Sequence, residues 1–347
     1  MNNTQINAYV DSYMANFTPY KGGEWCYEDG ILMTAIYDMY KVSGVQKYYD
    51  FVMNYFDGII GEDGSILRKR NESYNIDNIC PGIALMKLYR DNPLPKFKKC
   101  MDYLYDQLMK HPRTKENSFW HKEIYTNQVW MDGIYMGQVF YAMYAKEFGT
   151  AGIVEDIDHQ LHVADKRLWA PEKNLYMHAY DEAKVMQWAD PETGRSPHCW
   201  SRACGWVLMA MVDVYEEIGL DICKEILVKE VNSLKPYVTS GMLYQVVEEE
   251  NKEPNYKETS GSAMMAYALF KAKRIGMLDE YNLGMKVFDT IMAEEFDGTN
   301  LNGICRVAGL DNKKRDGSFE YYMSEDISSN EVKGVAPFIM AYSEIYG

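Results

Sequence analysis

Residues 129–144 read VWMDGIYMGQVFYAMY, and this stretch decides the fold class. Along a helix its apolar residues, among them Ile134, Val139, Phe140 and Met143, leave almost no polar face. A helix that is hydrophobic all round must be buried on every side. The stretch therefore predicts a helix at the centre of the protein.

The same pattern occurs six times along the chain. Each time a polar, small-residue or acidic entry precedes a mostly apolar run rich in Met, Ala, Leu and Tyr, and the runs cover residues 25–40, 74–89, 129–144, 200–215, 258–273 and 332–347. Amphipathic, more charged segments alternate with them, at residues 7–17, 45–56, 96–110, 154–168, 221–234 and 279–292. Their single apolar stripe is typical of outer helices that cover inner ones.

Strict alternation of six outer and six inner helices predicts an all-α fold, an (α/α)6 barrel. Each inner run joins the next outer helix through a few residues, as at Ser43-Gly44 and Gly219-Leu220, whereas most outer-to-inner connections are long. The long loops should therefore share one face, where the inner helices begin, and loops of that kind carry function. No linker or change in composition divides the chain, so we expect residues 1–347 to form a single domain.

Composition excludes several kinds of partner. The chain has 51 acidic and 36 basic residues and a net charge of −15, which argues against binding nucleic acid or an anionic membrane.

The N-terminus lacks the pattern of a signal peptide and no run is long enough to span a bilayer, so we expect a soluble, cytoplasmic protein, either a monomer or a homodimer. The seven cysteines lack CxxC spacing and are expected to be reduced core thiols. We expect no cofactor and no metal.

Two acids stand at the entries of inner runs. Asp77 and Asp132 should each lie in the first turn of a buried helix and project into the mouth of the same cavity. Helix capping is the alternative for acids at such positions. Two carboxylates in one pocket allow one of them to hold a proton at neutral pH, because burial and a like charge raise its pKa.

Histidines and aromatic residues gather in the same loops. His121 and His178 are candidates for contact with a ligand, although a loop histidine is more often a surface or hydrogen-bonding residue. Arg202 follows Trp200 and precedes Trp206, an arrangement suited to binding a carboxylate. Flat aromatic rings of this kind also bind the apolar faces of sugars.

Five segments together resemble a known family. They are FWHKEIYTNQVWMDGIYMG, LYMHAYDEA, QWADPETGRSPHCWSRACGWVLMAMVDV, LYQVVEEENKEPNYKETSGSAMMAYAL and VKGVAPFIMAY, and they resemble glycoside hydrolase family 105, the unsaturated rhamnogalacturonyl hydrolases, in the family's order. Family 88, the unsaturated glucuronyl hydrolases, is the nearest relative. The histidine loop before WMDG and the SPHCWSRACGW segment are more similar to family 105.

The resemblance implies an enzyme of pectin breakdown that removes a 4,5-unsaturated uronic acid from lyase-made oligosaccharides of the rhamnogalacturonan type. Asp132 matches the family's general acid/base and Asp77 the second acid of the pocket. The substrate-contacting positions implied by the match are His121, His178, Trp200, Arg202, Trp206, Trp25, Tyr27 and Trp130. The match is weakest at Trp25 and Tyr27, where the motif is short, and at Lys333. The implied partner is a small acidic oligosaccharide.

Two other functions fit the sequence. The same barrel hosts sugar epimerases and isomerases, which abstract protons with histidines, and His121 and His178 could serve that chemistry. A non-catalytic all-α scaffold that binds glycans through an aromatic groove is the other alternative. Neither reading gives the two acids a role.

Overall fold

The computed structural model describes residues 4–69 and 73–346, and most of its regular structure is helical. The inner helices are α2 (Tyr27–Ser43), α4 (Pro81–Asp91), α6 (Met131–Phe148), α8 (Ser201–Ile218), α10 (Thr259–Arg274) and α13 (Val332–Tyr346). The outer helices are α1 (Thr4–Ala15), α3 (Gln46–Ile59), α5 (Pro95–Lys110), α7 (Ile153–Leu168), α9 (Asp221–Leu234) and α11 (Tyr281–Glu294). Within the described ranges, none of the helices has the length and hydrophobicity needed to cross a membrane.

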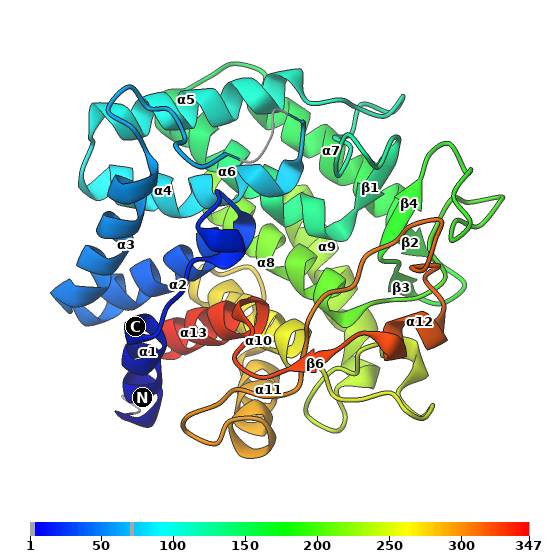
Figure 1. Ribbon diagram of the computed structural model, residues 1–347. Coiled ribbons are helices and arrows are strands. Elements are labelled where there is room, and N and C mark those ends of the chain that lie inside the picture. Colours follow the sequence, from blue (N-terminus) through cyan, green and yellow to red (C-terminus); the bar gives the residue numbers. More distant parts are fainter. Residues whose placement is uncertain (1–3, 70–72, 347) are drawn as a thin grey trace.

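The inner helices close into a ring. Each packs against the next one along the chain, and α13 packs back against α2, so that Figure 1 shows the red end of the chain beside the blue α2. The outer helices α3, α5, α7, α9 and α11 each pack against the inner helix that precedes them. The (α/α)6 barrel predicted from the repeated runs is confirmed.

Glycines end several inner helices and bring two of them close together. Gly44, Gly149 and Gly219 adopt φ of 68°, 65° and 68° and cap α2, α6 and α8, each donating its N–H to the carbonyl four residues back. Gly261 lies where α10 crosses the start of α8, and a Cβ there would be 2.6 Å from the Ser201 carbonyl group. Only glycine permits that approach.

The connections before the inner helices are long and contain short antiparallel ladders. β1 (Gln128–Trp130) pairs with β4 (Ala179–Asp181), β2 (Trp169–Ala170) with β3 (Leu175–Tyr176), and β5 (Ile304–Cys305) with β6 (Ile327–Ser328). A further short helix, α12 (Phe319–Ser324), lies in the last connection. The described loops also contain the 3-10 turns η1 (Tyr20–Gly22), η2 (Ile76–Ile79), η3 (Lys235–Tyr237) and η4 (Val247–Glu249). Strands of two or three residues are too short to carry a period-2 pattern, so the sequence did not predict them.

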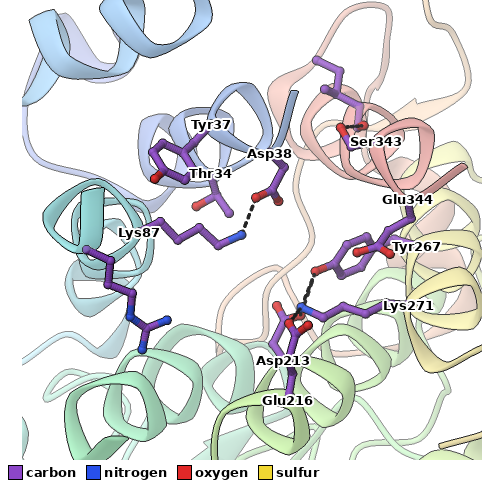
Figure 2. A network of polar contacts seen from close by, with 12 residues as sticks. Thr34, Tyr37, Asp38, Lys87, Asp213, Glu216, Tyr267, Lys271, Ser343 and Glu344 are labelled. Carbon is purple, nitrogen blue, oxygen red and sulfur yellow. Dashed lines mark hydrogen bonds and ion pairs between the residues drawn. The ribbon is translucent and has the colours of Figure 1, made fainter. Parts of the chain in front are cut away.

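The opposite end of the barrel, where the inner helices finish, is tied together by charges (Figure 2). Ion pairs join neighbouring inner helices there: Asp38 with Lys87, Lys271 with Asp213 and Glu216, and Arg274 with Glu344. Lys271 Nζ lies 2.7 Å from Asp213 Oδ1 and 2.6 Å from Glu216 Oε2. This end is therefore closed by a network that belongs to the architecture.

Candidate active site

A cavity of about 760 Å³ opens on the loop face, where the inner helices begin. Its walls come from the start of α2, from η2, from α6 and from the loops that precede α6 and α13. Six of the predicted site residues line it: Trp25, Tyr27, Asp77, His121, Trp130 and Asp132. The cavity also holds the cations Lys21, Lys122, Arg306 and Arg315, which the sequence did not single out.

Asp132 is placed by the ladder that leads into α6. β1 ends at Trp130, which pairs with Ala179 of β4, and the Met131 N–H donates to the His178 carbonyl at 3.0 Å. Asp132 then lies in the first turn of α6, as predicted. The register of β1 against β4 therefore fixes Asp132 beside His178.

The carboxylate of Asp132 and the ring of His178 face each other. His178 Nε2 lies 3.4 Å from Asp132 Oδ2, and neither atom makes a well-formed hydrogen bond to the described residues. His178 is fully buried, whereas the side chain of Asp132 keeps 16% of its surface exposed toward the cavity. Asp132 is thus open to a ligand on one side and backed by an imidazole on the other.

Asp77 lies in a different local structure from the one predicted. It belongs to the 3-10 turn η2, where Asn75 Oδ1 accepts its N–H at 3.1 Å, and α4 begins only at Pro81. The prediction of Asp77 in the first turn of the buried helix is therefore wrong. Pro81 has no N–H to donate to the Asp77 carbonyl, which accepts the Cys80 N–H at 3.3 Å instead, and this explains why the α-helix does not extend back to Asp77.

Asp77 is an ionised carboxylate. Its Oδ2 lies 2.6 Å from Lys122 Nζ, and its Oδ1 lies 3.7 Å from His121 Nε2. Burial raises the Asp77 pKa. Lys122 and then His121 lower it by a larger amount, so that the Asp77 pKa lies below its usual value. Asp77 is therefore not an acid whose pKa is raised.

His121 is neutral and part of an aromatic wall. Burial, opposed by Asp77, lowers its pKa to about 4. The ring lies parallel to Trp130 with centroids 4.6 Å apart, and Tyr125 lies parallel to Trp130 at 4.7 Å. A Cβ on Gly133 would be 3.0 Å from His121 Nδ1, so the helix start and the wall fit closely.

Three predicted contacts lie behind the cavity wall. Trp200 and Trp206 are each 1% exposed, and Trp200 Nε1 donates to Gln245 Oε1 at 3.0 Å. Arg202 is also 1% exposed; its Nε donates to Ser260 Oγ at 2.7 Å, and its Nη2 bonds the Cys305 carbonyl. The structure therefore places these side chains around the site, with the Arg202 guanidinium engaged inside the protein.

Two polar residues that the sequence analysis did not identify contact predicted site residues directly. Lys122 follows His121 directly and pairs with Asp77. Because a buried carboxylate needs a cationic partner, this basic residue next to a predicted site histidine could have suggested the pair. Tyr322 of α12 bonds His178 Nδ1 at 2.8 Å across a separation of 144 residues, and no local pattern predicts such a contact. Lys333, which the sequence placed at the same mouth, pairs instead with Glu331.

Comparison with known proteins gives consistent relatives. A family profile described as Glycosyl Hydrolase Family 88 matches residues 1–347. Protein Atu3128 of Agrobacterium fabrum (strain C58) is 35% identical over 228 residues, which are 60% of this chain and 97% of that protein. The unsaturated rhamnogalacturonyl hydrolase YesR of Bacillus subtilis (strain 168) is 22% identical over 268 residues, 72% of each chain.

Solved structures agree with these matches. A family 105 glycoside hydrolase of C. acetobutylicum ATCC 824 superposes with a TM-score of 0.92 at 40% identity and covers 98% of both chains. An unsaturated glucuronyl hydrolase specific for heparin superposes with a TM-score of 0.71 at 11% identity, covering 98% of this chain and 95% of that one. The second likeness concerns the fold alone.

Proposed function

The chain belongs to glycosyl hydrolase family 88, and from this premise we propose that it removes a 4,5-unsaturated uronic acid from the non-reducing end of lyase-made oligosaccharides. The observation that carries the proposal is the pair of carboxyls in one cavity with different surroundings. Asp77 is held ionised by Lys122, while Asp132 faces the imidazole of His178 and the open cavity. Such a pair can divide the roles of anion and proton donor.

The substrate chemistry suits a single acid that changes role. An unsaturated uronide is an enol ether, so its ring carbon C4 is the easiest atom to protonate. We propose that protonated Asp132 delivers this proton, leaving positive charge shared by C5 and the ring oxygen. The Asp132 carboxylate then takes a proton from a water molecule that adds at C5. The resulting hemiketal opens, C1 becomes a hemiacetal, and the rest of the oligosaccharide leaves.

The proposal gives the remaining cavity residues binding roles. An ionised Asp77 can accept hydrogen bonds from ring hydroxyls, and the parallel rings of His121 and Trp130 can cover an apolar sugar face. A substrate carboxylate needs a cation, because the protein carries a net charge of −15. The cavity cations Lys122 and Arg306 are better placed for this than the enclosed Arg202, for which we propose a supporting position beneath the site.

Asp132→Asn tests the proposal directly. The variant should fold like the wild type and fail to consume the near-ultraviolet absorbance of an unsaturated disaccharide, because asparagine cannot donate the proton. Asp50→Asn on the exposed surface of α3 is the matched control and should keep full activity. Retained activity in Asp132→Asn would refute the assignment. Isomerisation of the reducing sugar, or no reaction of the wild type, would favour the epimerase or the binding scaffold.

We propose rhamnogalacturonan-type oligosaccharides as the substrate class. The support is the name of one relative, the unsaturated rhamnogalacturonyl hydrolase of B. subtilis, which covers 72% of this chain. Unsaturated disaccharides that differ only in the second sugar test this choice. The rhamnose-linked disaccharide should give the highest kcat/KM, and preference for a glucosamine-linked one would contradict it.

A further inference from the structure

A second, much smaller cavity lies behind the ring of His121. Its volume is about 20 Å³, and it lies among η2, α6, α7 and the loop that precedes β1. His121 and Trp130 line both this small cavity and the cavity of the candidate active site. These two side chains therefore belong to a wall that the two cavities share.

Four of the side chains that line the small cavity have a buried polar atom without a hydrogen-bond partner among residues 4–69 and 73–346. These atoms are Ser118 Oγ, Trp120 Nε1, His121 Nδ1 and Gln138 Oε1. Ser118, His121 and Gln138 are only 3%, 4% and 5% exposed. Because buried polar groups are almost always hydrogen-bonded, four such atoms around one cavity indicate a common partner inside it.

The hydrogen-bonding direction of two of these atoms is fixed. Trp120 Nε1 can only donate. Gln160 accepts the Phe119 N–H at 3.0 Å, so the Gln160 atom at that position is its carbonyl oxygen. The Gln138 atom that lies 3.1 Å from the same oxygen must then be the amide nitrogen. Gln138 Oε1, which can only accept, is therefore the amide atom left for the cavity.

The ligand of the small cavity must accept from one of these groups and donate to the other. An ammonium ion has no lone pair to accept from Trp120, and a halide ion has no hydrogen to donate to Gln138. A water molecule does both. It needs about 10–15 Å³ and two to four polar partners, which matches a cavity of about 20 Å³ with four. We propose that the small cavity binds one water molecule, held by all four side chains.

The bound water determines which nitrogen of His121 carries the ring hydrogen. Its two lone pairs accept from Trp120 Nε1 and Ser118 Oγ. Its two hydrogens bond Gln138 Oε1 and His121 Nδ1, so that every hydrogen-bonding position of the water is used. Nδ1 is then an acceptor, and the hydrogen lies on Nε2, which faces the ionised Asp77 at 3.7 Å. The opposite tautomer would direct a lone pair at that carboxylate.

This arrangement makes His121 a hydrogen-bond donor in the candidate active site. No proton is transferred, because the water only fixes one of the two neutral forms of the ring. The water site itself rests on the geometry of the small cavity. Its effect on substrate binding rests on the proposed function, in which the Nε2–H of His121 can donate to an oxygen atom of the sugar.

A high-resolution crystal structure of the wild-type protein tests the water site directly. It should show one solvent peak within about 2.7–3.2 Å of Trp120 Nε1, Gln138 Oε1 and His121 Nδ1. The lack of a solvent peak there, or direct pairing of these atoms with one another, would overturn the proposal.

Two variants show whether the peak depends on the space beside His121. Gly133→Ala should exclude the water, because a Cβ at this position would be 3.0 Å from His121 Nδ1. Thr114→Val is the control: it removes a buried hydrogen bond to the Ser118 N–H, but Thr114 does not line the small cavity, so the peak should remain. A peak that persists beside His121 Nδ1 in Gly133→Ala contradicts the assigned position.

Nuclear magnetic resonance gives two further readouts that do not depend on turnover. The indole hydrogen of Trp120, assigned among seven tryptophans with Trp120→Phe, should show a nuclear Overhauser effect to water that is lost in Gly133→Ala. Burial lowers the pKa of His121 to about 4, so the ring is neutral at neutral pH, and 15N-labelled histidine should report the Nε2–H tautomer. The Nδ1–H tautomer would overturn the proposed effect on His121. An inactive wild type would refute the proposed function and leave all of these readouts unchanged.

Discussion

Replacing Lys271 with methionine should lower the free energy of unfolding by about 3 kcal/mol. The Lys271 and Asp213 side chains are only 6% and 8% exposed, and Lys271 joins α10 to α8 at the closed end of the barrel (Figure 2). Breaking a buried ion pair from one side costs about 3–5 kcal/mol, because a carboxylate stays buried without its cation. The lower figure applies here, since Asp213 keeps the Tyr267 hydroxyl at 2.7 Å and Glu216 keeps Arg274 at 2.7 Å.

The expected loss converts into a melting temperature. An unfolding entropy of about 2.1 cal/mol/K per residue gives about 0.73 kcal/mol/K for this chain of 347 residues. A loss of about 3 kcal/mol therefore lowers Tm by about 4 °C, measurable by scanning calorimetry at pH 7.

Lys273→Met on the same helix is the matched control. Lys273 pairs with Asp279 on the surface, where the two side chains are 50% and 64% exposed. An exposed pair of this kind contributes about 0–1 kcal/mol, so Tm should change by about 1 °C or less. Equal losses in the two variants, or a Lys271→Met protein that melts with the wild type, would refute the reasoning about burial.

Two further variants test buried carboxyls. Lys122→Met should raise the Asp77 pKa, because it removes the cation that opposes the effect of burial most strongly and leaves only the weaker effect of His121. The acid limb of kcat/KM should therefore move to higher pH. Lys122→Arg should keep the wild-type limb, and an unmoved limb in Lys122→Met would contradict the role of the pair. Burial raises the Glu230 pKa well above its usual value, so the folded protein retains a proton that the unfolded chain loses. Wild-type stability should therefore fall by up to about 1.4 kcal/mol per unit as the pH rises above about 4.5, and denaturant titrations of Glu230→Gln should show a shallower decline; parallel curves would exclude this.

The fold could be predicted because its signal is local. Each inner helix is buried all round, and that property is written in its own fifteen or so residues, as in residues 129–144. The alternation with amphipathic segments and the short connections at Gly44 and Gly219 then order the helices into a ring. Nothing in this inference depends on contacts between distant residues.

The site could be predicted only in part, because residue type does not report exposure. Asp132 and His178 were both expected at the mouth, and the ladder between β1 and β4 brings them together. In the sequence Arg202 cannot be distinguished from a surface arginine in an aromatic loop. Its partners Ser260, in the first turn of α10, and Cys305, in β5, come from later in the chain and enclose it. Tertiary contacts decide such cases, and a single sequence contains no direct record of them.

The direction of the inner helices offsets part of the protein's negative charge at the proposed site. The cavity lies at the helix starts, whereas Asp38–Lys87 and Arg274–Glu344 join helix ends at the opposite face, so all the inner helices point their N-termini toward the site. Each N-terminus carries a partial positive charge of about one half, and at least that of α6 lies directly at Asp132. These dipoles add to the cavity cations Lys21, Lys122, Arg306 and Arg315, and together they offset the carboxylates of the lining, which are Glu24, Glu28, Asp77, Asp132, Glu325 and Asp326. Parallel inner helices therefore make the open end of the barrel less negative than the charges of its side chains alone would make it.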